Sequence, residues 1–274
     1  MNDNKTSKNS IVAKFAVPIS FLILFFLAAN FTDCDLVTFW KRRNHLTDLV
    51  VDMIPPDFSY IQKILLPLFY TIQMSVTGTV LGTFFALVLS PFGAANLGFP
   101  AVIRRILRIV IQILRSFPAL ILALTATFLF GLGTFAGTFA ITLYTFAIMT
   151  KLTYEDASAA DVKAYQALRA MGVSKYVAYI HGILPEIIPG FLTNALYLLE
   201  TNVRHSSILG YVGAGGIGLL LNEKISWLEY DKVGTILLML FLTVCVIEYF
   251  SRYLAALIRK ERTICLLYTS DAAD

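Results

Sequence analysis

The glycines of the stretch GYVGAGGIG, residues 210–218, have the spacing of a nucleotide-binding turn. Gly213, Gly215 and Gly218 satisfy G-x-G-x-x-G, in which the backbone approaches a dinucleotide pyrophosphate at a helix N-terminus. That chemistry requires a preceding strand and an acidic residue about 20 residues further on. Here an apolar segment of membrane-span length precedes the glycines, and Glu229 comes too early. The sequence therefore argues against dinucleotide binding.

Residues that bind metals or act as nucleophiles are few and scattered. They form no C-x-x-C pair and no H-E-x-x-H pair, and the apolar segments hold no Gly-Asp pair or convincing Ser-His set. A G-x-x-x-x-G-K-[ST] loop for ATP is also absent from the sequence. We therefore expect no metal site, no cofactor in this chain and no enzyme activity. The residues concerned are His45, His181, His205, Cys34, Cys245 and Cys265.

The composition indicates a membrane protein. The 274 residues are 57% hydrophobic and 15% charged, with a mean hydropathy of +0.72. Soluble domains are about 45–50% apolar and about 25% charged. Basic residues do not cluster with aromatic ones in any polar stretch, so nucleic acid is a poor candidate partner.

The apolar segments predict an all-α membrane protein with about six transmembrane helices. The first segment is interpreted as a signal anchor rather than a cleaved signal peptide. Its apolar run is long, and Ala28-Ala29-Asn30 is a weak cleavage site. The expected spans are residues 11–31, 64–89, 109–130, 135–149, 189–209 and 233–254.

The distribution of Lys and Arg predicts that both ends of the chain are cytoplasmic. Most basic residues near span ends then fall on the inside, as in multi-pass inner-membrane proteins. The expected regions are a cytoplasmic N-terminus (1–10), the first transmembrane helix (11–31), a periplasmic loop (32–63), a core that contains the other spans (64–258) and a cytoplasmic tail (259–274). The tail beyond Arg262 receives no interpretation.

The polar stretch at residues 151–185 has apolar side chains at helical spacing. Gly172 interrupts the pattern and is expected to end or kink a helix, because glycine is unfavourable in a helix interior. The stretch is either an ordinary amphipathic hairpin or a docking element for a soluble partner. The apolar positions are Val162, Tyr165, Leu168, Gly172, Tyr176, Tyr179 and Ile183.

The same stretch resembles the cytoplasmic EAA loop of ABC importer permeases. Gln166-Ala167-Leu168 stands where that loop has Glu-Ala-Ala, Gly172 follows six residues after Gln166, and Leu184-Pro185 ends thirteen residues after Gly172. The chain departs from the pattern at Gln166 and Leu168. The resemblance implies that Gln166, Ala167, Leu168, Gly172, Leu184 and Pro185 couple the chain to an ATPase.

Further motifs resemble the phosphonate ABC transporter permease family, in that family's order over residues 55–260. They are Pro55-Pro56-Asp57-Phe58-Ser59, Gly131-Leu132-Gly133, Phe135-Ala136-Gly137, Leu168-Arg169-Ala170-Met171-Gly172, Asn202-Val203-Arg204 and GYVGAGGIG itself.

This resemblance implies a type I importer permease of the MetI-like fold in the bacterial inner membrane. It implies a homodimeric pore, two ATPase subunits that bind ATP and magnesium, and a periplasmic phosphonate-binding protein. Transport would proceed by alternating access. Two alternatives stay open, a permease for phosphite or another small phosphorus oxyanion and a channel that works without ATP.

Arg204 and the glycine stretch form the candidate substrate path. An arginine within a span is costly, so it indicates either an anion site or a pair with Glu200, four residues earlier on the same helix face. The glycines permit close helix packing or present N–H groups to an anion. The expected path residues are Arg204, Gly213, Gly215, Gly216 and Gly218.

Overall fold

The computed structural model describes residues 16, 18–29, 31 and 36–271, and its regular elements are all helices. The prediction of an all-α protein is therefore confirmed. The chain divides into two units, Met1–Asp52 and Met53–Asp274. Within the first unit lie a short apolar helix, Pro18–Ala29, and most of helix α2, Leu36–Met53. The predicted first span thus falls partly outside the described residues, and much of the predicted periplasmic loop is helical.

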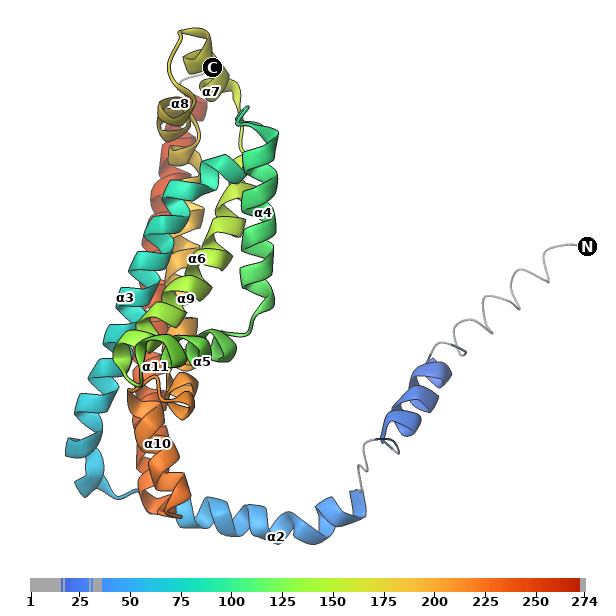
Figure 1. The fold of residues 1–274 in the computed structure, drawn as a ribbon, viewed down its shortest axis with the longest axis vertical. Coiled ribbons are helices and arrows are strands. Elements are labelled where there is room, and N and C mark those ends of the chain that lie inside the picture. Colours follow the sequence, from blue (N-terminus) through green and yellow to red (C-terminus); the bar gives the residue numbers. More distant parts are fainter. Residues whose placement is uncertain (1–15, 17, 30, 32–35, 272–274) are drawn as a thin grey trace, which may run out of the picture. The chain divides into compact units, whose positions relative to one another are not determined.

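The second unit is a bundle of long helices that run beside one another (Figure 1). These are α3 (Ile61–Gly93), α6 (Thr134–Ala159), α9 (Leu184–Leu209) and α11 (Tyr230–Asp271). Helix α4 runs along the bundle, whereas α5 crosses it (Figure 1). Their bounds are Ala101–Ser116 and Ala119–Phe130.

Shorter helices occupy the two ends of the bundle (Figure 1). Helices α7 and α8 form a hairpin at one end, and α10 lies at the opposite end. The bounds are Lys163–Ala170 for α7, Lys175–Gly182 for α8 and Ile217–Ser226 for α10. Two 3₁₀ turns, η1 (Phe58–Tyr60) and η2 (Gly210–Val212), complete the unit.

Among the described residues, three helices are long and apolar enough to cross a membrane, or up to five if each bent helix pair is one span. Helices α4 and α5 are bent by 94°, and α8 and α9 by 69°. The span expected over residues 109–130 is built from two helices rather than one. Phe117 is extended because the following Pro118 disfavours the helical conformation, and a new helix starts after the proline.

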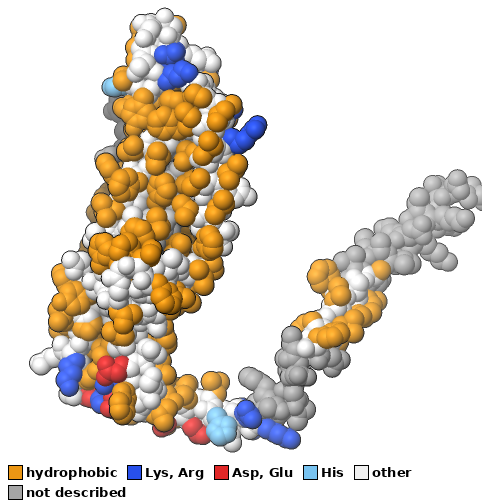
Figure 2. Space-filling view, in the orientation of Figure 1, with side chains coloured by type: hydrophobic (Ala, Val, Ile, Leu, Met, Phe, Trp, Pro, Cys, Tyr) orange, Lys and Arg blue, Asp and Glu red, His pale blue; other side chains and the backbone are white. Residues whose placement is uncertain are grey.

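The surface of the second unit matches a membrane environment. Figure 2 shows hydrophobic side chains over its middle, with charged groups gathered toward its ends. Phe84 is 58% exposed and Phe128 is 84% exposed. Soluble monomers rarely expose so continuous an apolar surface. The predicted number of about six spans requires that both bent pairs and the segment 11–31 each cross the membrane.

Glycines allow α3 and α6 to approach closely. A Cβ atom built on Gly78 would lie 2.6 Å from the Ile141 Cγ2 atom, and one on Gly82 would lie 2.7 Å from the Thr145 Cβ atom. Larger side chains would therefore separate the helices. Small residues at such spacing are typical of helix pairs in membranes, where van der Waals packing replaces the hydrophobic effect.

A buried polar cluster joins α3, α6 and α9 in the bundle core. Asn202 is fully buried, and its amide nitrogen donates to the hydroxyls of Thr79 and Thr145, each at 2.8 Å. The Ser75 and Ser206 hydroxyls lie 3.0 Å apart. Such bonds between helices are favourable in a membrane because a lone buried amide would lack water to bond.

Candidate functional site

The α7–α8 hairpin turns on Gly172, as the sequence predicts. Gly172 has φ +85°, a left-handed conformation that glycine adopts without steric cost. Its N–H donates to the Arg169 carbonyl at 3.1 Å, and the N–H of Val173 donates to the Leu168 carbonyl at 3.2 Å. This pair of bonds is the Schellman ending of a helix. The next helix starts at Ser174, whose hydroxyl accepts from a backbone N–H in the first turn.

Asp161 lies two residues before α7 and bonds to the first residue of that helix. The Asp161 carboxylate accepts the N–H of Lys163 at 2.9 Å. This backbone hydrogen bond, with support from the Lys163 side chain, lowers the pKa of Asp161. Negative charge at this position also favours the first turn of a helix. Both ends of α7 are thus specified by nearby residues.

Tyr165 fixes the hairpin to the bundle. Its hydroxyl donates to the Leu97 carbonyl at 2.6 Å, and the residue is only 5% exposed. Burial raises the pKa of its phenol. A Cβ atom on Gly182 would lie 2.8 Å from the Tyr165 backbone nitrogen, so α8 crosses α7 at close range. The sequence pattern placed Tyr165 on the apolar face but indicated nothing about its hydroxyl partner.

The tip of the hairpin presents most of the predicted coupling residues to its surroundings. Gln166, Ala167 and Gly172 are exposed, whereas Leu168 is half-buried against the bundle. The neighbouring Met171 is 70% exposed. Gln166, Ala167, Leu168, Met171 and Gly172, which lie in the hairpin at one end of the second unit, are here called the hairpin tip.

Leu184 and Pro185 lie apart from the hairpin tip, at the junction of α8 and α9. Pro185 stands in the first turn of α9, where a missing N–H costs nothing. The chain bends by 69° at this junction. These two residues therefore lie at the bend where the hairpin leaves the bundle, and the coupling role expected of all six residues stays a prediction.

The glycine stretch packs tightly against its neighbours. A Cβ atom on Gly218 would lie 1.9 Å from the Ser207 carbonyl oxygen, and one on Gly216 would lie 2.5 Å from the Thr71 hydroxyl. Gly213 and Gly215 are left-handed, and the Gly213 carbonyl accepts the Gly133 N–H at 2.9 Å. Close packing thus accounts for these glycines. Their part in a substrate path stays a prediction.

Arg204 lies on α9, one helical turn after Glu200. The two side chains form an ion pair, with the Arg204 side chain 50% exposed and the Glu200 side chain 14% exposed. The pair predicted from their spacing is therefore present, and one side of the guanidinium remains open. A pocket of about 320 Å³ begins at the next residue, His205, beside Tyr144 and Pro118.

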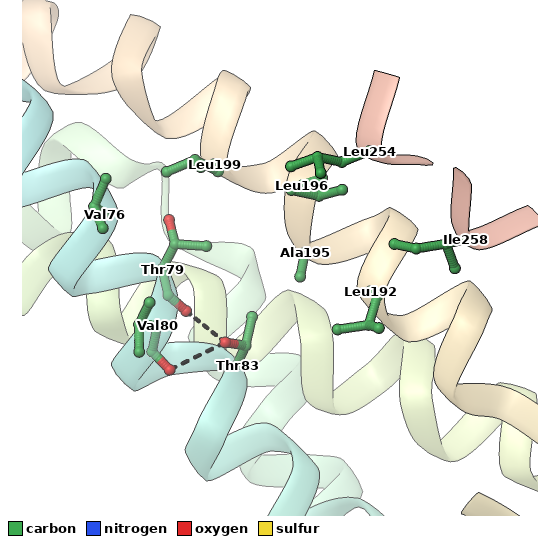
Figure 3. Close-up of a pocket in the computed structure, with 10 residues that line it drawn as sticks. All are labelled: Val76, Thr79, Val80, Thr83, Leu192, Ala195, Leu196, Leu199, Leu254 and Ile258. Atoms are coloured by element: carbon green, nitrogen blue, oxygen red, sulfur yellow. Dashed lines mark hydrogen bonds between the residues drawn. The ribbon is translucent and has the colours of Figure 1, made fainter. Parts of the chain in front are cut away.

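A second pocket, of about 250 Å³, lies between α3, α9 and α11 (Figure 3). Its polar side chains, Thr79 and Thr83, already bond within the protein. The Thr83 hydroxyl donates to the Thr79 carbonyl at 2.7 Å and to the Val80 carbonyl at 3.0 Å. The rest of the lining is aliphatic. The pocket in Figure 3 therefore suits an apolar chain and offers no ligand set for an ion.

The end of the unit opposite the hairpin carries a charge cluster that the sequence did not reveal. The ammonium groups of Lys63, Lys224 and Lys232 lie 5.5, 5.5 and 5.7 Å from the centre of the Tyr60 ring. Hydrogen bonds that the Lys224 ammonium donates to the Glu223 and Glu229 carboxylates raise the pKa of Lys224. The contributing residues come from two segments about 160 residues apart, 60–63 and 223–232, so spacing could not identify the cluster.

Comparison with known proteins identifies related membrane proteins. Residues 78–260 match the sequence model of the family described as binding-protein-dependent transport system inner membrane component. The chain is 31% identical over 217 residues to the phosphite transport system permease protein PtxC of Stutzerimonas stutzeri, covering 79% of each chain. It is 31% identical to the phosphate-import permease protein PhnE of Mycolicibacterium smegmatis, covering 74% of this chain and 38% of that protein.

Solved structures share the fold. An inward-facing MetNI methionine ABC transporter aligns with a TM-score of 0.64 at 20% identity, covering 74% of this chain and 99% of that one. An amino acid ABC transporter crystallised with histidines aligns with a TM-score of 0.59 at 16% identity, covering 72% and 95%. The prediction of a MetI-like fold is therefore confirmed.

Proposed function

Because the chain belongs to the family of binding-protein-dependent transport system inner membrane components, we propose that it imports a small phosphorus oxyanion, with phosphonate as the predicted substrate. Its general role follows from the family: it is a multi-pass permease subunit of an ABC importer. The observation that carries the substrate class is the similarity, over 79% of each chain, to a permease named for phosphite. A further relative, in Escherichia coli, is named as a putative cryptic phosphonate permease and is 30% identical over 115 residues.

Phosphite is the second candidate substrate. Two relatives in Stutzerimonas stutzeri that align over more than three quarters of their length are named as a phosphite permease and a putative one. Phosphite and phosphonates share a tetrahedral oxyanion and differ in the group on phosphorus. The binding protein and the pore would therefore need to distinguish hydrogen from carbon at one position.

Uptake measurements distinguish these candidates. Proteoliposomes containing the permease, its ATPase and its binding protein would be supplied with labelled methylphosphonate or labelled phosphite. Preferred uptake of one of them identifies the substrate. Uptake of both without ATP would instead support the channel alternative, and uptake of neither would refute the proposal.

We propose that the hairpin tip docks in a groove of the ATPase. The support is its position at one end of the bundle, its exposed residues and the Tyr165 bond that holds it rigidly. ATP binding and hydrolysis would then occur in two separate ATPase subunits. Their closure would move the hairpin, and the α8–α9 junction would transmit that movement to the core.

We further propose the assembly and orientation that the resemblance implies. Two copies of the chain would form the pore, a periplasmic binding protein would deliver the substrate, and both termini would be cytoplasmic. Arg204 would attract the anion as it enters. Arginine suits this role because its planar donors match phosphate-like oxygens and its charge persists at every physiological pH.

A further inference from the structure

Helix α4 carries a row of basic side chains along one edge. Arg104, Arg105, Arg108 and Arg115, together with Gln112, are here called the arginine stripe. At about 100° per residue these five positions fall within an arc of about 100° on the helix surface. The expected span over residues 109–130 divides them, because Arg104, Arg105 and Arg108 precede it and Arg115 falls within it.

The arginine stripe extends along the length of the bundle. Arg104 and Arg115 are eleven residues apart, which corresponds to about 17 Å along a helix axis. Figure 1 shows α4 running along the bundle rather than across it. The first arginines lie near the hairpin, since Lys175 of α8 donates to the Gly98 carbonyl just before α4. Arg115 lies one residue before the end of α4, at the bend toward α5.

The arginine stripe retains donors for a ligand. Arg104 donates to the Ala95 carbonyl at 3.3 Å, and Arg108 donates to the Gly93 carbonyl at 2.9 Å. These bonds use one N–H from each guanidinium, which has five. None of the four arginines forms an ion pair with a carboxylate among the described residues. The positive charge of the stripe is therefore not neutralised within the described part of the chain.

The arginine stripe also lines a hollow surface. A pocket of about 220 Å³ opens along it. The lining residues are Ala101, Arg104, Arg105, Arg108, Ile109 and Gln112. Beyond Arg115, at the bend between α4 and α5, lies the pocket beside Tyr144 and His205. The two hollows and the row of cations thus follow one another along the bundle.

We propose that the arginine stripe is the track along which a phosphorus oxyanion passes from the bend between α4 and α5 to the cytoplasmic end of the permease. This inference rests on the proposed function. Several arginines in succession would each bind the anion weakly. An ion in a transport path must bind well enough to enter and weakly enough to leave each site. Guanidinium groups match tetrahedral oxyanions through paired N–H donors.

An anionic lipid headgroup has the same chemistry and is the competing ligand. The polar region of a bilayer is about 5–8 Å thick on each side, the difference between the whole bilayer and its hydrocarbon core. A headgroup can therefore reach the first arginines of the stripe but not Arg115, which lies about 17 Å further along the helix. The length of the stripe along the helix therefore favours the transported anion over a lipid headgroup as its ligand.

The first experiment measures uptake by the complete complex of permease, ATPase and binding protein in proteoliposomes. Arg108→Gln and Arg115→Gln should each lower kcat/KM for the transported oxyanion on the order of 10-fold, the value of one charge-assisted hydrogen bond. Arg108→Lys and Arg115→Lys should retain more activity. Arg252→Gln on α11 removes the same charge elsewhere and should transport like the parent protein. Parent-like uptake by both stripe Gln variants would overturn the inference.

The second experiment detects the anion without transport. Gln112→Cys and Ile113→Cys, in a chain whose native cysteines are replaced, place thiols on adjacent exposed positions that face about 100° apart. In the purified complex in nanodiscs, an anionic sulfonate thiol reagent should react faster with the cysteine at position 112. Methylphosphonate or phosphite should protect that cysteine and leave the one at position 113 unaffected.

Two outcomes separate this inference from the proposed function. If the parent complex takes up neither oxyanion, the proposed function fails. The protection experiment at position 112 does not need transport, so it still tests whether the anion binds the stripe. If the parent complex transports but the cysteine at position 112 is unprotected, the track is refuted. Protection or a transport defect that depends on phosphatidylglycerol in the bilayer would assign the stripe to a lipid headgroup and would also refute the track.

Discussion

Replacing Gly172 by alanine or by leucine distinguishes two effects. Both residues strain the left-handed backbone of the α7–α8 turn, but only leucine adds a large side chain to the hairpin tip. Gly172 has φ +85°, and a Cβ atom there would meet no other atom within 4 Å. A left-handed conformation costs an L-residue about 1–2 kcal/mol, against a folding free energy of about 5–15 kcal/mol. Alanine and leucine should therefore impose the same strain, and both variants should fold.

The two variants should differ once a partner covers the hairpin tip. A larger side chain at this position is not crowded inside this chain, because the space around Gly172 is open. Crowding of that side chain is therefore a matter of the partner's surface. It can arise only against a docked ATPase. Extra side-chain volume in a packed interface costs about 1–3 kcal/mol, which corresponds to an affinity about 5- to 150-fold weaker.

The assay is titration of the ATPase onto the permease in nanodiscs, followed by ATP hydrolysis stimulated by the binding protein. We expect Gly172→Leu to lose ATPase binding and Gly172→Ala to retain most of it. Gly131→Leu is the matched control, since Gly131 has φ +83° and equally open surroundings in the turn between α5 and α6. Equal affinities for the alanine and leucine variants, or the same loss in the control, would refute docking through the hairpin tip.

Three further predictions concern orientation, the anion site and the hairpin anchor. Reporter fusions at Lys175 and Lys224 should lie on opposite sides of the membrane, and the same side for both would contradict the proposed topology. Arg204→Gln should abolish uptake, and adding Glu200→Gln should not restore it; restored uptake would mean that the ion pair is only structural. Tyr165→Phe leaves a buried carbonyl unpaired and should destabilise the permease by about 1–3 kcal/mol, measured as a lower Tm, whereas an unchanged Tm would show that the hydroxyl does not anchor the hairpin.

The fold class and the α7–α8 hairpin could be predicted from short stretches of the sequence. Apolar runs are long enough to cross a bilayer only as helices, because a backbone without water must bond to itself. Gly172 ends α7 because the left-handed turn depends on one residue and its immediate neighbours. The spacing from Gln166 to Pro185 likewise follows from the chain itself, whereas the ATPase contact that it predicts remains to be tested.

Hydropathy could not predict the direction of each apolar segment. It measures transfer into lipid and gives the same value for a straight helix and for a chain that bends by 94°. The bend within the expected span over residues 109–130 was missed for this reason, although Pro118 marks the break. The arginine stripe was missed through the same error, since it becomes one helical face only when α4 begins at Ala101.

Only the tertiary structure decided which distant groups meet. Ser207 approaches Gly218 so closely that a methyl group would not fit, and the Tyr165 hydroxyl reaches a carbonyl sixty-eight residues away. Such contacts depend on how helices cross, which is set by the summed packing of many side chains rather than by any local pattern. The sequence by itself determined that this chain is a helical membrane protein with a turn at Gly172, and the packing of the helices decided where its charges lie relative to one another.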